Sequence, residues 1–124
     1  MPAKLIWGNQ SLQIILSGIV TGNEIRAYES QIWVDPRFDE LRYAIWDGRD
    51  IEGWNVSASD LGMSVGYSVG HSFSNRTIRL ALVMTDMAIY ESGKQFVQGL
   101  ASAKISWDVK LFQDMDLALD WLKA

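Results

Sequence analysis

The chain has 124 residues and a formal net charge of −4, from 11 Lys and Arg against 15 Asp and Glu, with one His and no Cys. This length predicts one domain over residues 1–124, able to bury about two-thirds of the surface that the unfolded chain exposes, and the missing Cys excludes disulfides and thiolate sites. The negative charge disfavours nucleic acid as a partner, and with no apolar run of ~20 residues and no signal peptide we expect a cytoplasmic protein without stable membrane insertion.

Two short apolar stretches begin the chain, Lys4 to Trp7 and Leu12 to Ser17. Between them lie Gly8-Asn9-Gln10-Ser11, whose residue types are typical of a hairpin turn. The sequence therefore predicts two strands joined by a tight turn.

A helix is expected to follow from about Gly22. Thr21 and Glu24 form a capping box, in which each side chain satisfies a free backbone amide of the first turn. The helix is predicted to end at Asp35-Pro36, because the residue before a proline is pushed out of the helical region.

The central stretch of the chain consists of a strand followed by an acidic segment. Leu41 to Trp46 is apolar on both faces, which is typical of a parallel strand covered on both sides. Asp47 to Ser57 is acidic and interrupted by glycines, so we expect a loop there. Open α/β sheets usually bind their ligands at such strand ends.

A second helix is predicted from the cap formed by Ser57 and Asp60 to about Ser72. Apolar residues spaced three or four apart predict its core face. These residues are Ala58, Leu61, Val65 and Val69.

The last third of the chain predicts two more strands and two more helices. The strands are expected at Ile78 to Met84 and Val109 to Phe112, and the helices begin at Asp86 and Asp114. Alternating strands and helices favour parallel pairing. The expected fold is therefore a single α/β domain, with a mixed, mostly parallel five-stranded sheet flanked by about four helices.

Several stretches of this chain resemble one known family. They read Leu-Arg-Tyr-Ala-Ile-Trp-Asp at 41–47, Gly-Trp at 53–54, and Lys-Leu-Phe at 110–112 followed by Asp-Leu-Ala-Leu-Asp-Trp-Leu at 116–122. With the order of elements, they resemble the SpoIIAA-like branch of the STAS superfamily, the stand-alone bacterial domains described as STAS/SEC14-like. The resemblance covers nearly the whole chain. It implies a mixed sheet flanked by helices, regulatory protein binding as in anti-sigma-factor antagonists, and apolar or lipid ligands as in the SEC14-like members.

The phosphoacceptor motif of the better-known antagonists is absent here. Those proteins carry an Asp-Ser-Ser-Gly-like sequence at the start of the helix after the central strand, where this chain has Asn-Val-Ser-Ala-Ser-Asp at 55–60. The resemblance therefore does not extend to a phosphoserine switch. Ser57 and Ser59 still lie at a helix N-terminus, where either capping or phosphate binding is possible, and Asp60 favours capping.

Acidic residues follow two of the predicted central strands. Asp47, Asp50, Glu52 and Asp86 would meet at one sheet edge and could hold a divalent cation through oxygen ligands. The same residue types also form turns and helix caps, which is the commoner role. Arg49 could pair with these carboxylates or with an anionic ligand.

His71 is the single histidine, so histidine-based catalysis would have to use it. The predicted helix runs antiparallel to the strands and places His71 far from Asp47 and Asp86. The expected geometry therefore disfavours a charge-relay arrangement. We expect His71 to have a structural role at the C-terminus of its helix.

Three glycines spaced four apart, Gly62, Gly66 and Gly70, lie on one stripe of the helix predicted at 58–72. They cost ~3 kcal/mol relative to alanine unless close packing compensates. The stripe indicates close approach of another helix, within the domain or in a dimer, or else room beneath the helix for a ligand. The remaining alternative is that the segment is partly irregular.

Six tryptophans and 48% hydrophobic residues are more apolar surface than a small domain easily hides. Five of the six are expected in core or edge packing: Trp7, Trp33, Trp46, Trp107 and Trp121. Trp54 is expected above the sheet edge, where it either plugs the core or lines a binding cleft.

These patterns predict a non-catalytic binding or regulatory module without a cofactor or metal. We expect it to act through protein association, first of all as a homodimer, by way of the 47–57 loop and the 58–72 helix. Capture of a small apolar or lipid-like ligand is the alternative, and a metal-dependent enzyme using Asp47, Asp50 and Asp86 is a second one. The candidate binding residues are Asp47, Arg49, Asp50, Trp54, Ser57, Gly62, Gly66, Gly70 and Asp86.

Overall fold

The computed structural model describes residues 3–124 and has the α/β architecture that the sequence predicts. Its elements in chain order are β1 (Ala3–Gly8), β2 (Ser11–Thr21), α1 (Gly22–Val34), a 3-10 turn (Pro36–Glu40), β3 (Tyr43–Asn55), α2 (Ala58–Ser72), β4 (Arg79–Val83), α3 (Met87–Ser102), β5 (Asp108–Phe112) and α4 (Met115–Lys123). The five strands form one sheet in the order β1-β2-β3-β4-β5. β1 is antiparallel to β2, and all other neighbouring strands are parallel.

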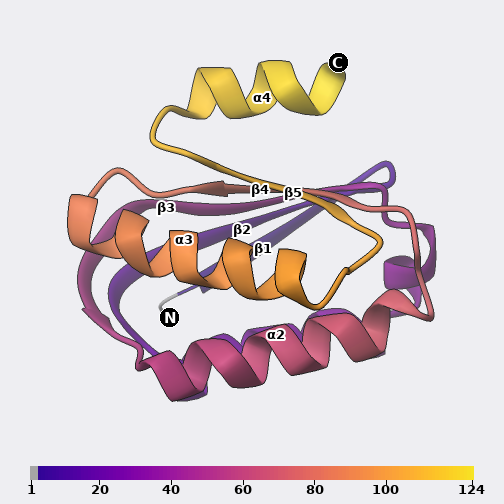
Figure 1. Cartoon of the computed structure of the whole chain (residues 1–124). Coiled ribbons are helices and arrows are strands. Elements are labelled where there is room, and N and C mark those ends of the chain that lie inside the picture. The colour runs from indigo at the N-terminus through magenta and orange to yellow at the C-terminus, as the bar shows by residue number, and fades with distance from the viewer. Residues whose placement is uncertain (1–2) are drawn as a thin grey trace.

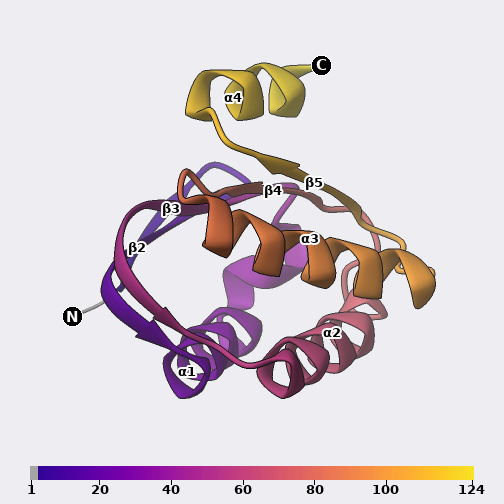
Figure 2. The same ribbon diagram turned by 60° about the vertical axis from the view of Figure 1, so that its left-hand side comes forward.

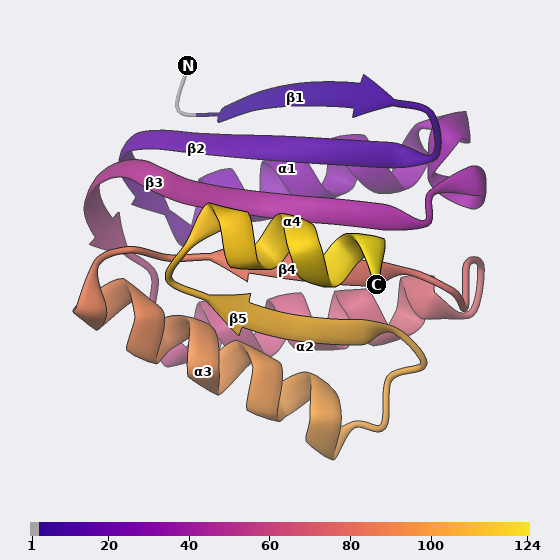
Figure 3. The ribbon, with the colours of Figure 1, turned by 90° about the horizontal axis from the view of Figure 1, so that it is seen from above.

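The helices cover the two faces of the sheet unequally. Helices α1, α2 and α3 lie on one face, which we call the inner face, and α4 lies alone on the other (Figures 1 and 2). Seen from above, α4 lies across the middle of the sheet near β4 (Figure 3). The main hydrophobic core therefore lies between the inner face and three helices.

The N-terminal hairpin is confirmed. β1 pairs with β2 in register, with Leu5 opposite Ile14, and Gln10 adopts a positive φ of 56° in the turn between them. Alternation along β2 buries Leu12, Ile14 and Leu16 against the helices. The hairpin thus supplies one wall of the core.

The loop predicted at Asp47 to Ser57 is wrong, because β3 continues through this segment to Asn55. β2 is equally long and pairs with it as far as Thr21 opposite Asn55, with two register shifts along the way. Gly48 lies within this strand, where a Cβ would be only 2.9 Å from the carbonyl oxygen of Val83. The glycine therefore allows close packing and does not mark a loop. β2 and β3 continue past the end of β4, and these extensions curve around the helices (Figure 2).

The predicted helix starts are confirmed by their caps. The Thr21 side chain accepts a hydrogen bond from the amide of Glu24, but Glu24 Oε2 has no hydrogen-bond partner among the residues described, so only half of the box predicted there forms. Ser57 and Asp60 form a complete capping box. Helix α1 ends at Val34, immediately before Asp35-Pro36. No helix within residues 3–124 is long and apolar enough to cross a membrane.

The predicted core face of α2 is partly wrong. The buried positions are Ser64, Ser68 and Ser72, whereas the predicted Leu61, Val65 and Val69 are half-buried and Ala58 is exposed. The helix packs mainly against α3 and α1 and makes few contacts with the sheet. Its small serines therefore face the interior, and the apolar residues beside them contact the neighbouring helices.

Candidate functional site

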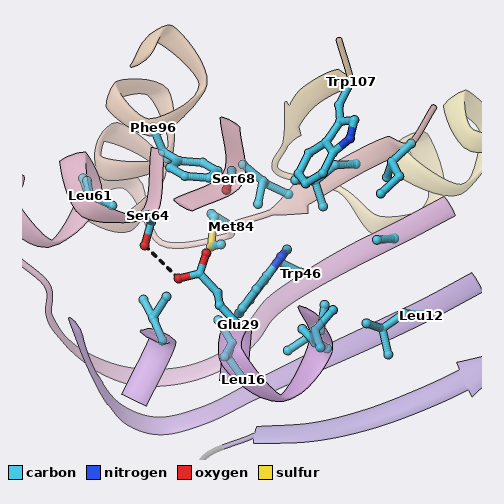
Figure 4. Close-up of a pocket in the computed structure, with 18 of the residues that line it drawn as sticks. Leu12, Leu16, Glu29, Trp46, Leu61, Ser64, Ser68, Met84, Phe96 and Trp107 are labelled. Atoms are coloured by element: carbon cyan, nitrogen blue, oxygen red, sulfur yellow. Dashed lines mark hydrogen bonds between the residues drawn. The ribbon is translucent and has the colours of Figure 1, made fainter. Parts of the chain in front are cut away.

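A cavity of about 90 Å³ lies between the inner face of the sheet and helices α1, α2 and α3 (Figure 4). We call it the inner chamber. Its walls are almost entirely apolar: β2, β3 and β4 contribute residues that alternate along each strand, such as Leu12, Trp46 and Leu80. A cavity of this size exceeds the ~10–15 Å³ that one water molecule needs and is smaller than the ~150 Å³ that admits benzene.

The chamber exists because α2 lies away from the sheet. The residues of α2 that line it are Leu61, Ser64 and Ser68. Serine side chains are too short to fill the space that leucine or phenylalanine would occupy at these positions. The interior is therefore less completely filled than the close packing of most protein cores.

Glu29 of α1 is the charged residue in the wall of the chamber, and only 5% of its surface is exposed. Its Oε1 accepts a hydrogen bond of 2.9 Å from the hydroxyl of Ser64. The other carboxyl oxygen points into the chamber, towards Ser68 and Met84 (Figure 4). One oxygen of this buried carboxyl is thus left for an occupant.

Burial raises the pKa of Glu29 to about 7, against the lowering influence of the Ser64 hydrogen bond and the charge of Arg26. An apolar environment disfavours the ionised carboxylate, which accounts for the direction of the shift. Near neutral pH the chamber therefore contains a group that either donates or accepts a proton. Such perturbed carboxyls in pockets are typical of functional sites.

Trp54 is the predicted site residue that reaches the inner chamber. It lies near the end of β3, and its indole Nε1 donates a hydrogen bond of 3.2 Å to the hydroxyl of Ser92 on α3. Trp54 both lines the chamber and packs against the hydrophobic core, so the structure does not choose between the two expected roles. Other aromatic residues in the wall are Trp33, Phe38, Trp46, Phe96 and Trp107.

Asp47 and Arg49 lie on the opposite face of β3 from the chamber-lining Trp46. Asp47 is 2% exposed and accepts hydrogen bonds from Arg49 Nε at 3.0 Å, Arg49 Nη2 at 2.9 Å and Gln13 Nε2 at 3.2 Å. Burial would raise the pKa of Asp47, but the hydrogen bonds and charge of Arg49 outweigh it and hold the pKa below its usual value. Arg49 therefore pairs with a carboxylate of its own strand.

The carboxylates expected to converge do not do so. Asp50 and Glu52 are exposed on β3, and Asp86 caps α3 by accepting hydrogen bonds from the amides of Ala88 and Ile89. Within residues 3–124, no three His, Asp or Glu side chains are placed to hold a metal ion. The convergence predicted for Asp47, Asp50, Glu52 and Asp86 is wrong because the segment after Trp46 is a strand, which separates its side chains.

Ser57 is a cap and His71 is a packing residue. The hydroxyl of Ser57 accepts a hydrogen bond of 3.0 Å from the backbone amide of Asp60. Phosphate binding at this helix N-terminus would need that amide to be free. His71 stacks on Trp33, with ring centroids 4.1 Å apart, and burial lowers its pKa. His71 lies in the last turn of α2, as expected, and its ring packs against aromatic residues.

The glycine stripe of α2 faces away from the chamber. Gly62, Gly66 and Gly70 are exposed, and a Cβ added at any of them would meet no atom within 4 Å. Close packing of the glycines inside the domain is therefore wrong, and α2 is a continuous helix, so the irregular alternative is wrong as well. A cavity does lie beneath α2, but its serines face it and its glycines do not. Close approach in a dimer stays a prediction.

Three chamber residues, Glu29, Ser64 and Ser68, were missed from the sequence. A signal was present: Glu29 lies four residues after Ile25 and three before Ile32, on the apolar face of its helix. Ser64 and Ser68 show the same spacing of four on the next helix. A charged residue within an apolar stripe is unusual enough to mark a candidate site.

Comparison with known proteins does not add to this geometry, since no family model, curated protein or solved structure matches the chain. Function is therefore argued from the chamber itself.

Proposed function

We propose that this protein is a binding module that holds a small, largely apolar ligand in the inner chamber, as a carrier or a sensor. The observation that carries the proposal is a cavity of about 90 Å³ with an apolar wall and one buried carboxyl aimed into it. Ligand pockets commonly combine mostly apolar walls with a few placed polar groups. The ligand class also agrees with what the resemblance to STAS/SEC14-like domains implies.

The wall supports this function through its aromatic residues. Trp46 and Trp54 on β3 and Phe96 on α3 offer flat apolar surface to an occupant. Trp54 is held by its hydrogen bond to Ser92, so β3 and α3 are tied together at the chamber wall. A ligand between them would contact the sheet and a helix at the same time.

Two measurements test the proposal. Native mass spectrometry of the purified protein should show a bound small molecule, or the tryptophan indole resonances should shift on addition of xenon or 1-pentanol. A Ser68→Leu variant, which fills the chamber, should lose the response, while Ser59→Leu, at an exposed position of the same helix, should keep it. A bare mass together with unchanged resonances on adding both probes would overturn the proposal.

The second candidate function is self-association through α2. What supports it is that Gly62, Gly66 and Gly70 are open to solvent, so packing within the chain does not compensate their cost of ~3 kcal/mol. Met63 and Tyr67, four residues apart on the same helix, are also exposed. A second copy of α2 approaching along this stripe would bury the glycines and these two side chains.

Light scattering during gel filtration tests self-association. A dimer should have about twice the monomer mass of 14.0 kDa, and Gly66→Leu should return it to the monomer. Gln98→Leu, which adds a leucine to an exposed position of α3, is the control and should leave the mass unchanged. A single monomeric species at micromolar concentration would contradict this candidate.

A further inference from the structure

The structure leaves the second carboxyl oxygen of Glu29 to be explained. Ser64 occupies one oxygen at 2.9 Å, and the other points into the chamber (Figure 4). A buried carboxyl is costly in an apolar cavity unless a partner is present. The free oxygen therefore indicates the chemistry of the occupant.

We propose that Glu29, with Ser64 beside it, binds the ammonium group of a small aliphatic amine whose hydrocarbon part occupies the inner chamber. The inference rests on the proposed function, since it names the ligand class of the same site. A carboxylate accepts hydrogen bonds from an ammonium group and compensates its charge, and charge-assisted bonds of this kind are stronger than neutral ones.

Within residues 3–124, Glu29 forms no ion pair. Arg26, on the same helix as Glu29, donates to Asp60 of α2 at 2.8 Å and to Asn23. The residues of β2, β3, β4, α2 and α3 that line the chamber carry no titratable side chain, and His71 of α2 stacks on Trp33. An occupant that brings a positive charge fits this site, and one that brings a carboxylate would be repelled.

The wall also limits the size of the amine. With about 90 Å³ available, the chamber suits a short unbranched chain better than a long acyl chain. Ser68 also lines the chamber, so its hydroxyl is a further polar group in the wall.

The pH dependence of binding follows from the two groups. Binding requires that Glu29 is ionised and that the amine is protonated. The pKa of Glu29 is about 7 in the empty protein. The pKa of an alkyl ammonium group such as that of lysine is about 10.4. Affinity for the amine should therefore rise about tenfold between pH 6 and pH 8 and fall again above pH 10. A neutral ligand should show no such rise.

The test uses three probes of equal chain length with the full-length protein at pH 8: 1-pentylamine, 1-pentanol and pentanoate. Binding is followed by calorimetry and by the tryptophan indole resonances. Pentylamine should bind at least tenfold more tightly than pentanol, and pentanoate should bind more weakly than either. At pH 6, where Glu29 is mostly protonated in the empty protein, its side-chain carboxyl resonance should shift to that of the ionised form when pentylamine binds.

Glu29→Gln is the decisive variant because it keeps the volume and an oxygen for Ser64. It should reduce the affinity for pentylamine at least tenfold, to the level of pentanol, and abolish the rise between pH 6 and pH 8. Glu40→Gln, at an exposed position, is the matched control and should change neither. Binding of pentanol to Glu29→Gln also shows that the variant is folded.

The possible outcomes separate the two proposals. If xenon and pentanol bind but pentylamine has no advantage, or keeps its advantage in Glu29→Gln, the amine inference is overturned and the proposed function stands. If xenon, pentanol and pentylamine all fail to bind, both are overturned.

Discussion

Two carboxylates show how strongly the surroundings of a residue decide its role. Asp47 and Glu29 are both buried, but Asp47 has the guanidinium of Arg49 beside it, whereas Glu29 has one hydroxyl. The pKa of Asp47 is lowered and that of Glu29 is raised to about 7. Asp47 is therefore the ionised partner of Arg49 in an ion pair, whereas Glu29 changes its protonation state near neutral pH.

The first prediction at this scale concerns stability against pH. Because the folded-state pKa of Glu29 lies above the unfolded value of 4.5, the folded protein binds more protons between these values, and stability falls as pH rises from about 4.5 to 7. Glu29→Gln should remove this decline and make the protein more stable than wild type above pH 7, by about 3 kcal/mol. Urea unfolding at pH 5 and pH 8 measures it. An equal effect of the substitution at both pH values would contradict it.

A second prediction compares two ion pairs of the same local form. Arg49 and Arg37 each make a bidentate contact with an aspartate two residues earlier, but the side chain of Asp47 is 3% exposed and that of Asp35 is 22% exposed. Arg49→Met should lower the free energy of unfolding by about 1–2 kcal/mol, since it leaves a buried carboxylate without its cation. Arg37→Met should have little effect because water replaces the lost partner. Equal losses in the two variants would show that burial does not set the difference.

At the scale of elements, glycine has opposite meanings in two neighbouring helices. Gly93 of α3 lies against Leu111 of β5, where an added Cβ would approach a side-chain methyl to 2.9 Å. Gly66 of α2 faces open space. The sequence does not distinguish these positions, because both glycines interrupt an amphipathic helix. The difference arises from which face of each helix is covered.

The prediction for these helices follows from that contrast. Gly66→Ala should raise the free energy of unfolding of the monomer by about 0.5–1 kcal/mol, through helix propensity alone. Gly93→Ala should gain the same propensity but must displace the flexible side chain of Leu111, so its net gain should be smaller than that of Gly66→Ala. Thermal unfolding of both variants at low concentration measures the two effects. Equal stabilisation by both substitutions would mean that Leu111 moves aside without cost.

At the scale of the whole molecule, the inner chamber results from the way three layers meet. Helix α4 packs closely on the outer face, around Ala81, Val83 and Phe112. On the inner face, α2 contacts the other helices more than the sheet, and its serines leave the space open. The protein thus combines a well-packed side with an incompletely filled one, and the candidate site lies on the latter.

Filling the chamber should make the protein more stable and unable to bind. Ser68→Leu adds apolar volume to the chamber wall, so it should raise the free energy of unfolding by about 1–2 kcal/mol, roughly what burying an additional leucine side chain in available space contributes. Chemical denaturation measures the gain, and pentanol titration measures the loss of binding. A destabilised Ser68→Leu would indicate that the chamber is too narrow for the added carbons.

The sequence by itself determined the order of strands and helices, the hairpin, the helix caps and the α/β class, because each depends on residues close together in the chain. Thr21 with Glu24 and Ser57 with Asp60 are such local signals. Only the tertiary structure decided that Asp47 to Asn55 is a strand. The backbone of this segment pairs with β2, which lies more than 30 residues earlier in the chain. The tertiary structure also decided that Glu29 and Ser68 face a cavity, because the side of a helix that is covered depends on the neighbours that fold against it.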